Sequence, residues 1–274
     1  MRFGIIADDL DQRLQGQVAL HPPTTIKELA VIEAKTCRQL SKSKWLPSVL
    51  VALMCALVPL LARADEPSER VTRAAQVFKE LANAPNGLPI NVLNKADCVI
   101  ILPSVKKAGF IVGAQYGKGV MSCRSGQNFD GPWGPPIMMQ SSGGSFGLQA
   151  GGQATDFVIL VMNDDGARSV MKGRAKLGAE TSIAAGPVGR NAEAATSATM
   201  QAQMLSYSRA QGVFAGVSLS GTSLGPDDGD NEKIYGKKIS GPEIFSGSVQ
   251  PPPSAADLLA ELEKASPKNL AKGK

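Results

Sequence analysis

The chain has 274 residues, of which 43% are hydrophobic and 19% charged, with 29 Lys and Arg against 24 Asp and Glu. This composition excludes a disordered chain and a coiled coil, and the length supplies a core for one large domain or two small ones. One His and four Cys leave little scope for His-based catalysis or zinc, whereas 29 Gly indicate a fold rich in turns and strands.

The first 64 residues have the pattern of a targeting segment. An apolar run, 46–62, follows two lysines and leads into Ala62-Arg63-Ala64, and these are the three parts of a secretory signal peptide. We therefore expect a signal peptide at 40–64, with a retained membrane anchor as the alternative. Since a signal peptide begins shortly before its basic segment, we expect 1–39 to be an artefact of a start codon assigned too far upstream.

Removal of this signal region changes the charge and the cysteine content. The remaining chain has 21 Lys and Arg against 19 Asp and Glu, a net charge of +2, and no His. Of the cysteines, only Cys98 and Cys123 remain, and an oxidising compartment favours a disulfide between them over two buried thiols. We expect an exported protein, periplasmic or secreted, and the small net charge argues against a nucleic-acid partner.

Residues 68–82 are predicted to form a helix with Ser68 as its N-cap, because apolar residues recur there at helical spacing. The apolar stripe and the basic residues that flank it are Val71, Ala74, Ala75, Phe78, Leu81 and Ala82, with Arg70, Arg73 and Lys79. Two interpretations are open: the stripe packs on the rest of the domain, or the helix lies on an anionic membrane.

The rest of the predicted domain, 65–248, has the texture of a β protein. Strands and related apolar segments are predicted at 99–102, 108–115, 119–123, 137–140, 145–149, 156–162, 177–185, 194–208 and 213–220. The sequence also predicts a helix at 165–172, an acidic loop at 227–232, and helical turns near 233–235 and 243–245. Residues 249–274 are predicted to be a Pro-rich linker and a helical tail. We expect an α+β fold: a β-dominated antiparallel sheet or barrel-like domain, with an N-terminal amphipathic helix and short peripheral helices.

Catalytic and metal signatures are weak. Ser145 and Ser223 each lie in a G-x-S-x-G pattern, but the mature chain lacks the His of a serine triad. Lys106 or Lys118 as the base is the remaining hydrolase alternative. The carboxylates of 227–232 do not have the spacing of an EF-hand, and no phosphate-binding loop is present. We therefore expect a non-enzymatic protein without metal or cofactor.

Three local basic groups stand out in an otherwise nearly neutral chain. They are Lys106 with Lys107, Lys118 with Arg124, and the run Arg168, Lys172, Arg174 and Lys176. Each serves either solubility or contact with anionic lipid headgroups, where a Lys or Arg near the surface contributes about 1 kcal/mol.

Seven segments of the chain follow the order and residue types of one known domain. They are Lys95–Phe110, Tyr116–Val120, Trp133–Pro136, Phe146–Asp156, Ala185–Arg190, Tyr207–Leu219 and Asn231–Gly236. The most specific are Gly-Pro-Val-Gly-Arg, at Gly186–Arg190, and Gly-Val-Phe-Ala-Gly-Val-Ser-Leu, at Gly212–Leu219. The segment from about 69 to 247 thus resembles the SYLF domain family.

This resemblance implies a lipid-binding module. Eukaryotic SYLF domains bind phosphoinositides, with an N-terminal amphipathic helix and basic residues involved, and some engage actin. By position, the implied lipid-binding residues are those of the 68–82 helix and the strand that follows, to which we add Lys118: Arg70, Arg73, Lys79, Lys106, Lys107 and Lys118. The expected partner is an anionic phospholipid or membrane surface. A structural or protein-interaction module of the periplasm, bound to an envelope protein, is the alternative.

Overall fold

The computed structural model describes most of the chain after the predicted signal region. The described residues are 66–84, 87–109, 112–146, 153–173, 175–179, 181–188, 201–210, 213–217, 219–247 and 249–271, within the compact unit Asp65–Lys274. The predicted signal peptide and the residues before it lie outside this set. Within the described ranges, no helix combines the length and apolar character needed to cross a bilayer.

The fold is α+β, as predicted, with one curled mixed sheet as its centre. The strands are β1 (Cys98–Gly109), β2 (Val112–Cys123), β3 (Ile137–Phe146), β4 (Gln153–Val161), β5 (Ala175–Lys176), β6 (Ile183–Ala185), β7 (Met204–Ala210), β8 (Val213–Gly216) and β9 (Thr222–Pro226). Their order is β5-β9-β3-β2-β1-β4-β7-β6, and β8 also pairs with β7. All pairs are antiparallel except β6 with β7, and the curl produces a half-barrel.

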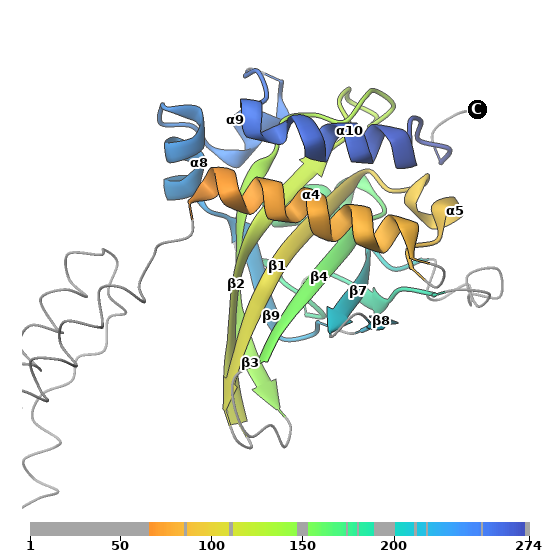
Figure 1. Cartoon of the computed structure of the whole chain (residues 1–274), viewed down its shortest axis with the longest axis vertical. Helices are drawn as coiled ribbons and strands as arrows, with labels where there is room; N and C mark the ends of the chain where they lie inside the picture. Colours follow the sequence, from red (N-terminus) through yellow and green to blue (C-terminus); the bar gives the residue numbers. More distant parts are fainter. Residues whose placement is uncertain are drawn as a thin grey trace, which may run out of the picture. The chain divides into compact units, whose positions relative to one another are not determined.

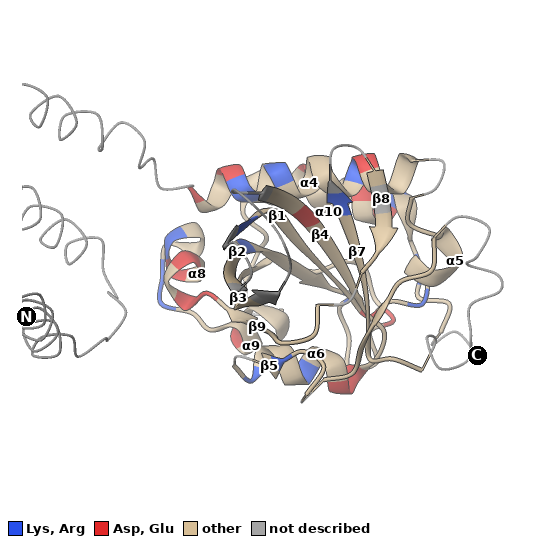
Figure 2. Cartoon of the chain, turned by 90° about the horizontal axis from the view of Figure 1, so that it is seen from below, with Lys and Arg blue, Asp and Glu red and all other residues tan. Residues whose placement is uncertain are grey.

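Helices cover both faces of this sheet. They are α4 (Pro67–Asn83), α5 (Ile90–Leu93), α6 (Asp164–Met171), α8 (Asp228–Tyr235), α9 (Gly241–Phe245), the 3₁₀ turn η2 (Pro253–Ala255) and α10 (Ala256–Ala265). In Figures 1 and 2, α4 and α10 lie side by side over one face, while α6 lies on the opposite side of the sheet. Each face therefore encloses its own apolar core.

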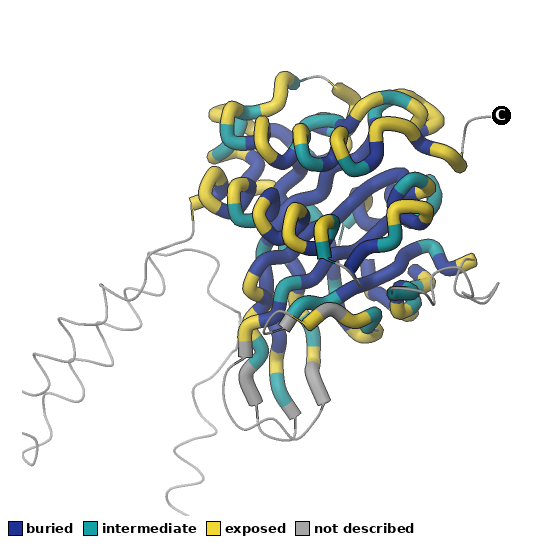
Figure 3. Tube along the Cα trace, turned by 45° about the vertical axis from the view of Figure 1, so that its right-hand side comes forward, coloured by how far each residue is buried: buried dark blue, intermediate teal, exposed yellow. Residues whose placement is uncertain are grey.

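The predicted N-terminal helix is confirmed within one residue at each end, as α4. Its first turn starts with Pro67, whose fixed backbone suits that position, and the N-cap is Glu66 rather than the predicted Ser68. The apolar stripe, including Val71, Phe78 and Leu81, is buried against the sheet and α10. Figure 3 shows α4 as buried on one side and exposed on the other, so the stripe belongs to the core.

Several strands are longer than the sequence pattern predicts. The residues Tyr116-Gly117-Lys118, expected to form a turn, continue β2 without a break, and β3 likewise joins two predicted strands. Gly117 sits where a Cβ would lie 2.5 Å from Val105 Cγ2, so glycine serves close strand packing here and not a turn. The acidic loop is instead a helix, α8, and β9 was not expected at all.

The C-terminal helix is part of the same core as α4. Leu258 and Leu262 of α10 are fully buried, and the segment after α10 lies against the end of the sheet at which β2 terminates. There Ser266 O accepts hydrogen bonds from Arg124 Nη2 at 2.8 Å and from Trp133 Nε1 at 2.9 Å. The tail predicted beyond the Pro-rich segment thus contributes core side chains in this fold.

Candidate functional site

The first turn of α4 is joined to β2 and α8 by a cluster of ionic groups. Arg70 Nη1 lies 2.7 Å from Asp230 Oδ2, and these side chains are only 2% and 4% exposed. Lys118 Nζ from β2 reaches Asp230 at 2.8 Å and Asp227 at 2.6 Å, and Lys233 Nζ reaches Asp230 Oδ1 at 3.0 Å. We call these five residues the α4 anchor.

The α4 anchor fixes the charge of its carboxylate. Burial alone would raise the pKa of Asp230, but the hydrogen bonds from Lys118, Arg70 and Lys233 outweigh it and hold the pKa well below its usual range. For Lys118, burial favours a lower pKa, and its hydrogen bonds to Asp227 and Asp230 reverse this and raise it. Asp230 and Lys118 therefore both stay ionised at neutral pH.

Two of the predicted lipid-binding residues, Arg70 and Lys118, are members of this anchor. The structure places Arg70 inside the protein rather than on a membrane-facing surface, because its guanidinium neutralises a buried carboxylate. Lys118 is partly buried between two carboxylates for the same reason. Their neighbour Arg124 is also internal: its guanidinium stacks 4.3 Å from the Trp133 ring.

The other basic residues of α4 are nearer the solvent. Lys79 is 59% exposed and lies 3.3 Å from Glu261 of α10, while Arg73 is half-buried on the same helix. The outward side of α4 also carries Glu69 and Glu80. Its exposed surface is thus of mixed charge, as Figure 2 shows, and does not form a purely basic strip.

Lys106 and Lys107 lie on β1 beyond a bulge. The register of β1 against both β2 and β4 shifts by one residue between Leu102 and Lys106, and Ser104 in this bulge has a φ of 52°. Its backbone N–H donates to Asp156 Oδ1 at 2.8 Å, and the same carboxylate accepts from Arg209 Nε at 2.9 Å. The bulge reverses the side-chain alternation, so that Val105 is buried and Lys106 faces outward.

A row of exposed side chains crosses the sheet at the level of Lys106. In the strand register, Ala154 of β4, Lys106 of β1, Tyr116 of β2 and Ser142 of β3 are successive neighbours. All four are exposed, Tyr116 by 49%. They lie on the same face of the sheet as Val99, Ile101 and Val120, which α4 covers farther along these strands. We call this row, with Ala114 of β2, the arm face.

Tyr116 was missed as a site residue because its neighbour Gly117 suggested a turn. The signal that could have found it is the alternation of β2, in which Tyr116, Lys118 and Val120 share one face. Lys107 points to the opposite face, where its Nζ lies 5.2 Å from the centre of the Phe157 ring. The structure therefore brings Lys106 and Lys107 to one end of the sheet, apart from the α4 anchor.

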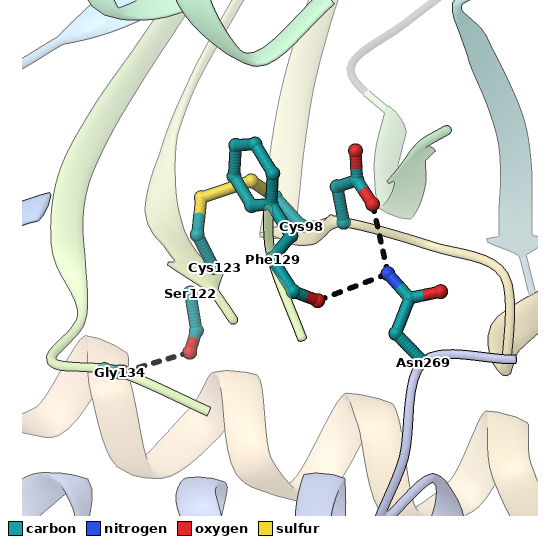
Figure 4. The surroundings of a disulfide bond; sticks show 7 residues. Cys98, Ser122, Cys123, Phe129, Gly134 and Asn269 are labelled. Carbon is teal, nitrogen blue, oxygen red and sulfur yellow. Dashed lines mark hydrogen bonds between the residues drawn. A yellow bond between two sulfur atoms is a disulfide. The ribbon is translucent and has the colours of Figure 1, made fainter. Parts of the chain in front are cut away.

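The predicted disulfide is present between Cys98 and Cys123, which are opposite each other in the β1–β2 register. Figure 4 shows it beside Phe129, whose backbone oxygen accepts a hydrogen bond from Asn269 Nδ2 at 3.1 Å. Ser122, next to the bridge, donates from its hydroxyl to Gly134 O at 2.9 Å. The bridge thus closes the sheet end at which the C-terminal segment is bound.

The residues considered for hydrolase or metal chemistry have other structural roles. Ser145 and Ser223 lie within β3 and β9, and neither stands on the sharp strand-to-helix turn that a nucleophile elbow requires. Of the acidic segment, Asp227 and Asp230 accept from cationic side chains in the α4 anchor. Among the described residues no group of His, Cys, Asp or Glu is arranged to hold a metal ion.

Comparison with known proteins matches residues 142–265 to the family model described as Las17-binding protein actin regulator, Ysc84. LAS seventeen-binding protein 3 of Saccharomyces cerevisiae is 36% identical over 191 residues, covering 69% of this chain and 40% of that protein. Protein YSC84 of the same yeast is 35% identical over 197 residues, covering 71% and 41%. SH3 domain-containing YSC84-like protein 1 of Homo sapiens is 32% identical over 209 residues, covering 75% and 60%. The chain thus spans between two fifths and three fifths of the length of these relatives.

Proposed function

Because this chain belongs to the SYLF (Ysc84) domain family, we propose that it is a non-enzymatic module that binds anionic lipid at the surface of a bacterial envelope membrane. The family resemblance, which implies lipid binding, supports the ligand class. The signal-peptide pattern of residues 40–64 and the Cys98–Cys123 bridge support an exported location. The location at a bacterial envelope membrane is not taken from the named relatives and is specific to this proposal.

The observation that carries this proposal is the placement of Lys106 and Lys107. Within the described residues neither lysine has a carboxylate partner, in contrast to Lys118, Lys79 and Lys233. An unneutralised lysine at a membrane surface contributes about 1 kcal/mol of attraction to anionic lipid, and this attraction falls with salt. Two such lysines give weak, reversible and charge-dependent binding.

Co-sedimentation of the full chain with vesicles tests this function. We expect pelleting with vesicles of phosphatidylglycerol and phosphatidylcholine, less with phosphatidylcholine alone, and release as the salt concentration is raised. The comparison between the two lipid mixtures separates charge-dependent binding from any insertion of the apolar run 46–62, which does not depend on headgroup charge. Equal pelleting on both lipid mixtures at every salt concentration contradicts the proposal.

A protein partner is the second candidate, favoured by the name of LAS seventeen-binding protein 3 and by the description of the family model, both of which state binding to Las17. For this chain the corresponding partner is an envelope protein, bound independently of lipid. Cross-linking in intact cells, followed by reconstitution of the cross-linked pair from purified components without lipid, distinguishes this candidate. A pair that reassembles in detergent-free buffer favours the protein-interaction role.

A further inference from the structure

The apolar face of α4 is unavailable to a membrane while the fold is intact. Val71, Ala74 and Phe78 are fully buried between the sheet and α10, and the α4 anchor ties the first turn to β2 and α8. Insertion of this face into lipid would expose to water the apolar surface of the sheet against which it packs. The gain from burial in lipid would therefore be offset by the loss of burial in the core. The membrane contact of the folded protein therefore has to come from another surface.

The charge distribution indicates which surface this is. Strands β1, β2 and β3 together contain three Lys and no Asp or Glu, and one of these lysines, Lys118, is neutralised in the α4 anchor. No carboxylate occurs in residues 131–155 either. The part of the sheet that projects beyond α4 in Figure 1 thus has Lys106 and Lys107 as its charged side chains on β1, β2 and β3.

The arm face also has residue types that suit contact with a membrane surface. Ala114, Ser142 and Ala154 are small, so the strands themselves can approach a planar surface closely. Tyr116, directly opposite Lys106, is amphipathic, and such aromatic rings favour the boundary between headgroups and acyl chains. The β1 bulge, which is held by Asp156 and Arg209, turns Lys106 to this face.

From these placements we infer that the arm face, with Lys106 and Tyr116 at its centre, is the surface that lies on an anionic bilayer while α4 stays docked. This rests on the proposed lipid-binding function and assigns it a location. The occupant is a lipid surface, because the exposed row joins Lys106, which has no carboxylate partner among the described residues, to an interfacial aromatic ring, and strands β1, β2 and β3 contain no Asp or Glu.

Fluorescence quenching by lipids with brominated acyl chains tests the location directly. In the full chain, Tyr116→Trp is expected to add quenching on anionic vesicles to the background signal of Trp45 and Trp133 in the wild-type chain, because the ring would lie at the acyl boundary. Gln76→Trp, on the exposed side of α4, is the matched reporter and is expected to keep its emission. Quenching at position 76 but not at 116 overturns the inference in favour of α4.

Charge reversal provides the second test. Lys106→Glu with Lys107→Glu is expected to weaken binding to anionic vesicles at least tenfold, whereas Lys237→Glu with Lys238→Glu, an exposed neighbouring pair outside the sheet, leaves it within twofold. Equal losses for both pairs indicate bulk charge and overturn the assignment. If the wild-type chain binds no anionic vesicle, the proposed function itself is wrong. If the chain binds but the Trp at position 116 is not quenched, only the assignment of the contact to the arm face is wrong.

Discussion

At the scale of single residues, the motif Gly186–Arg190 begins with a glycine whose role is steric. A Cβ on Gly186 would lie 2.2 Å from Tyr207 Cζ, and a Cβ on Gly216 would lie 2.0 Å from Gly186 O. Tyr207 is fully buried, and burial raises the pKa of its hydroxyl, so the ring is held un-ionised against this backbone. Three motif residues that are far apart in sequence therefore meet in one close contact.

We predict that Gly186→Ala lowers the free energy of unfolding by about 2 kcal/mol or more, because overpacking at a buried ring forces the backbone apart. Urea denaturation measures this change. Gly144→Ala, where no atom lies within 4 Å of the added Cβ, is the matched control and should have little effect. If the Gly186→Ala protein is as stable as the Gly144→Ala protein, the strands move apart without loss of stability and the steric argument is wrong.

A second residue-scale prediction concerns Asp230. Its carboxylate has a lowered pKa in the folded protein, so it contributes stability that is fully present above its unfolded pKa of about 3.9 and is lost progressively as the pH falls from that value through the lower pKa of the folded state. Asp230→Asn, which leaves Arg70 beside a neutral amide, should cost about 3 kcal/mol at pH 7. The difference between variant and wild type should shrink as the pH falls below about 4.

The measurement for Asp230 is the free energy of unfolding from urea titrations at several pH values between neutral and acid. Asp228→Asn, an exposed carboxylate of the same helix, provides the control and should change stability by no more than about 0.5 kcal/mol. A difference that stays constant with pH would mean that the carboxylate is not held ionised by its three cationic neighbours.

At the scale of elements, local pattern predicted some segments well and others not at all. The bounds of α4 and α6 were predicted to within one residue because the signals that favour a helix are local, although the N-cap of α4 is Glu66 and not Ser68. The continuity of β2 through Gly117 could not be predicted, since glycine is needed there because Val105 on the neighbouring strand leaves no room for a side chain. The burial of Arg70 likewise depends on Asp230, which is 160 residues away in the chain.

The site was predictable to the same extent. Lys106 and Lys107 were found from the sequence as a basic pair, but the face to which each points is set by the bulge, where Ser104 of β1 contacts Asp156 of β4. A regular strand would have placed Val105 outward and Lys106 inward. The arm face is therefore a product of pairing register, and no single segment of sequence contains it.

An element-scale prediction concerns the segment after α10. Asn269 Nδ2 donates to Asp97 Oδ1 at 2.8 Å and to Phe129 O at 3.1 Å, and the residue is buried. Asn269→Ala should lower the free energy of unfolding by about 1 to 3 kcal/mol, since both buried acceptors lose this donor. Lys268→Ala, at the exposed neighbouring position, is the control for urea denaturation and should be near neutral.

At the scale of the whole molecule, two cores share one curled sheet. The side chains of β1 alternate between the cores: Val99 and Ile101 pack under α4, whereas Ile100 and Leu102 pack on the other side. The central pair β1–β2 is therefore common to both. A covalent link at its end, Cys98–Cys123, restrains the strand pair on which both cores are built.

We predict that loss of this link destabilises the whole domain by about 3 kcal/mol, because the bridge closes a loop with a sequence separation of 25 and restricts the unfolded chain. Urea denaturation of the oxidised chain with and without a thiol reductant measures the change. The double variant Cys98→Ala with Cys123→Ala should match the reduced wild type and should not respond to reductant. Since the full chain also contains Cys37 and Cys55, a response that persists in the double variant would trace the redox dependence to those residues instead.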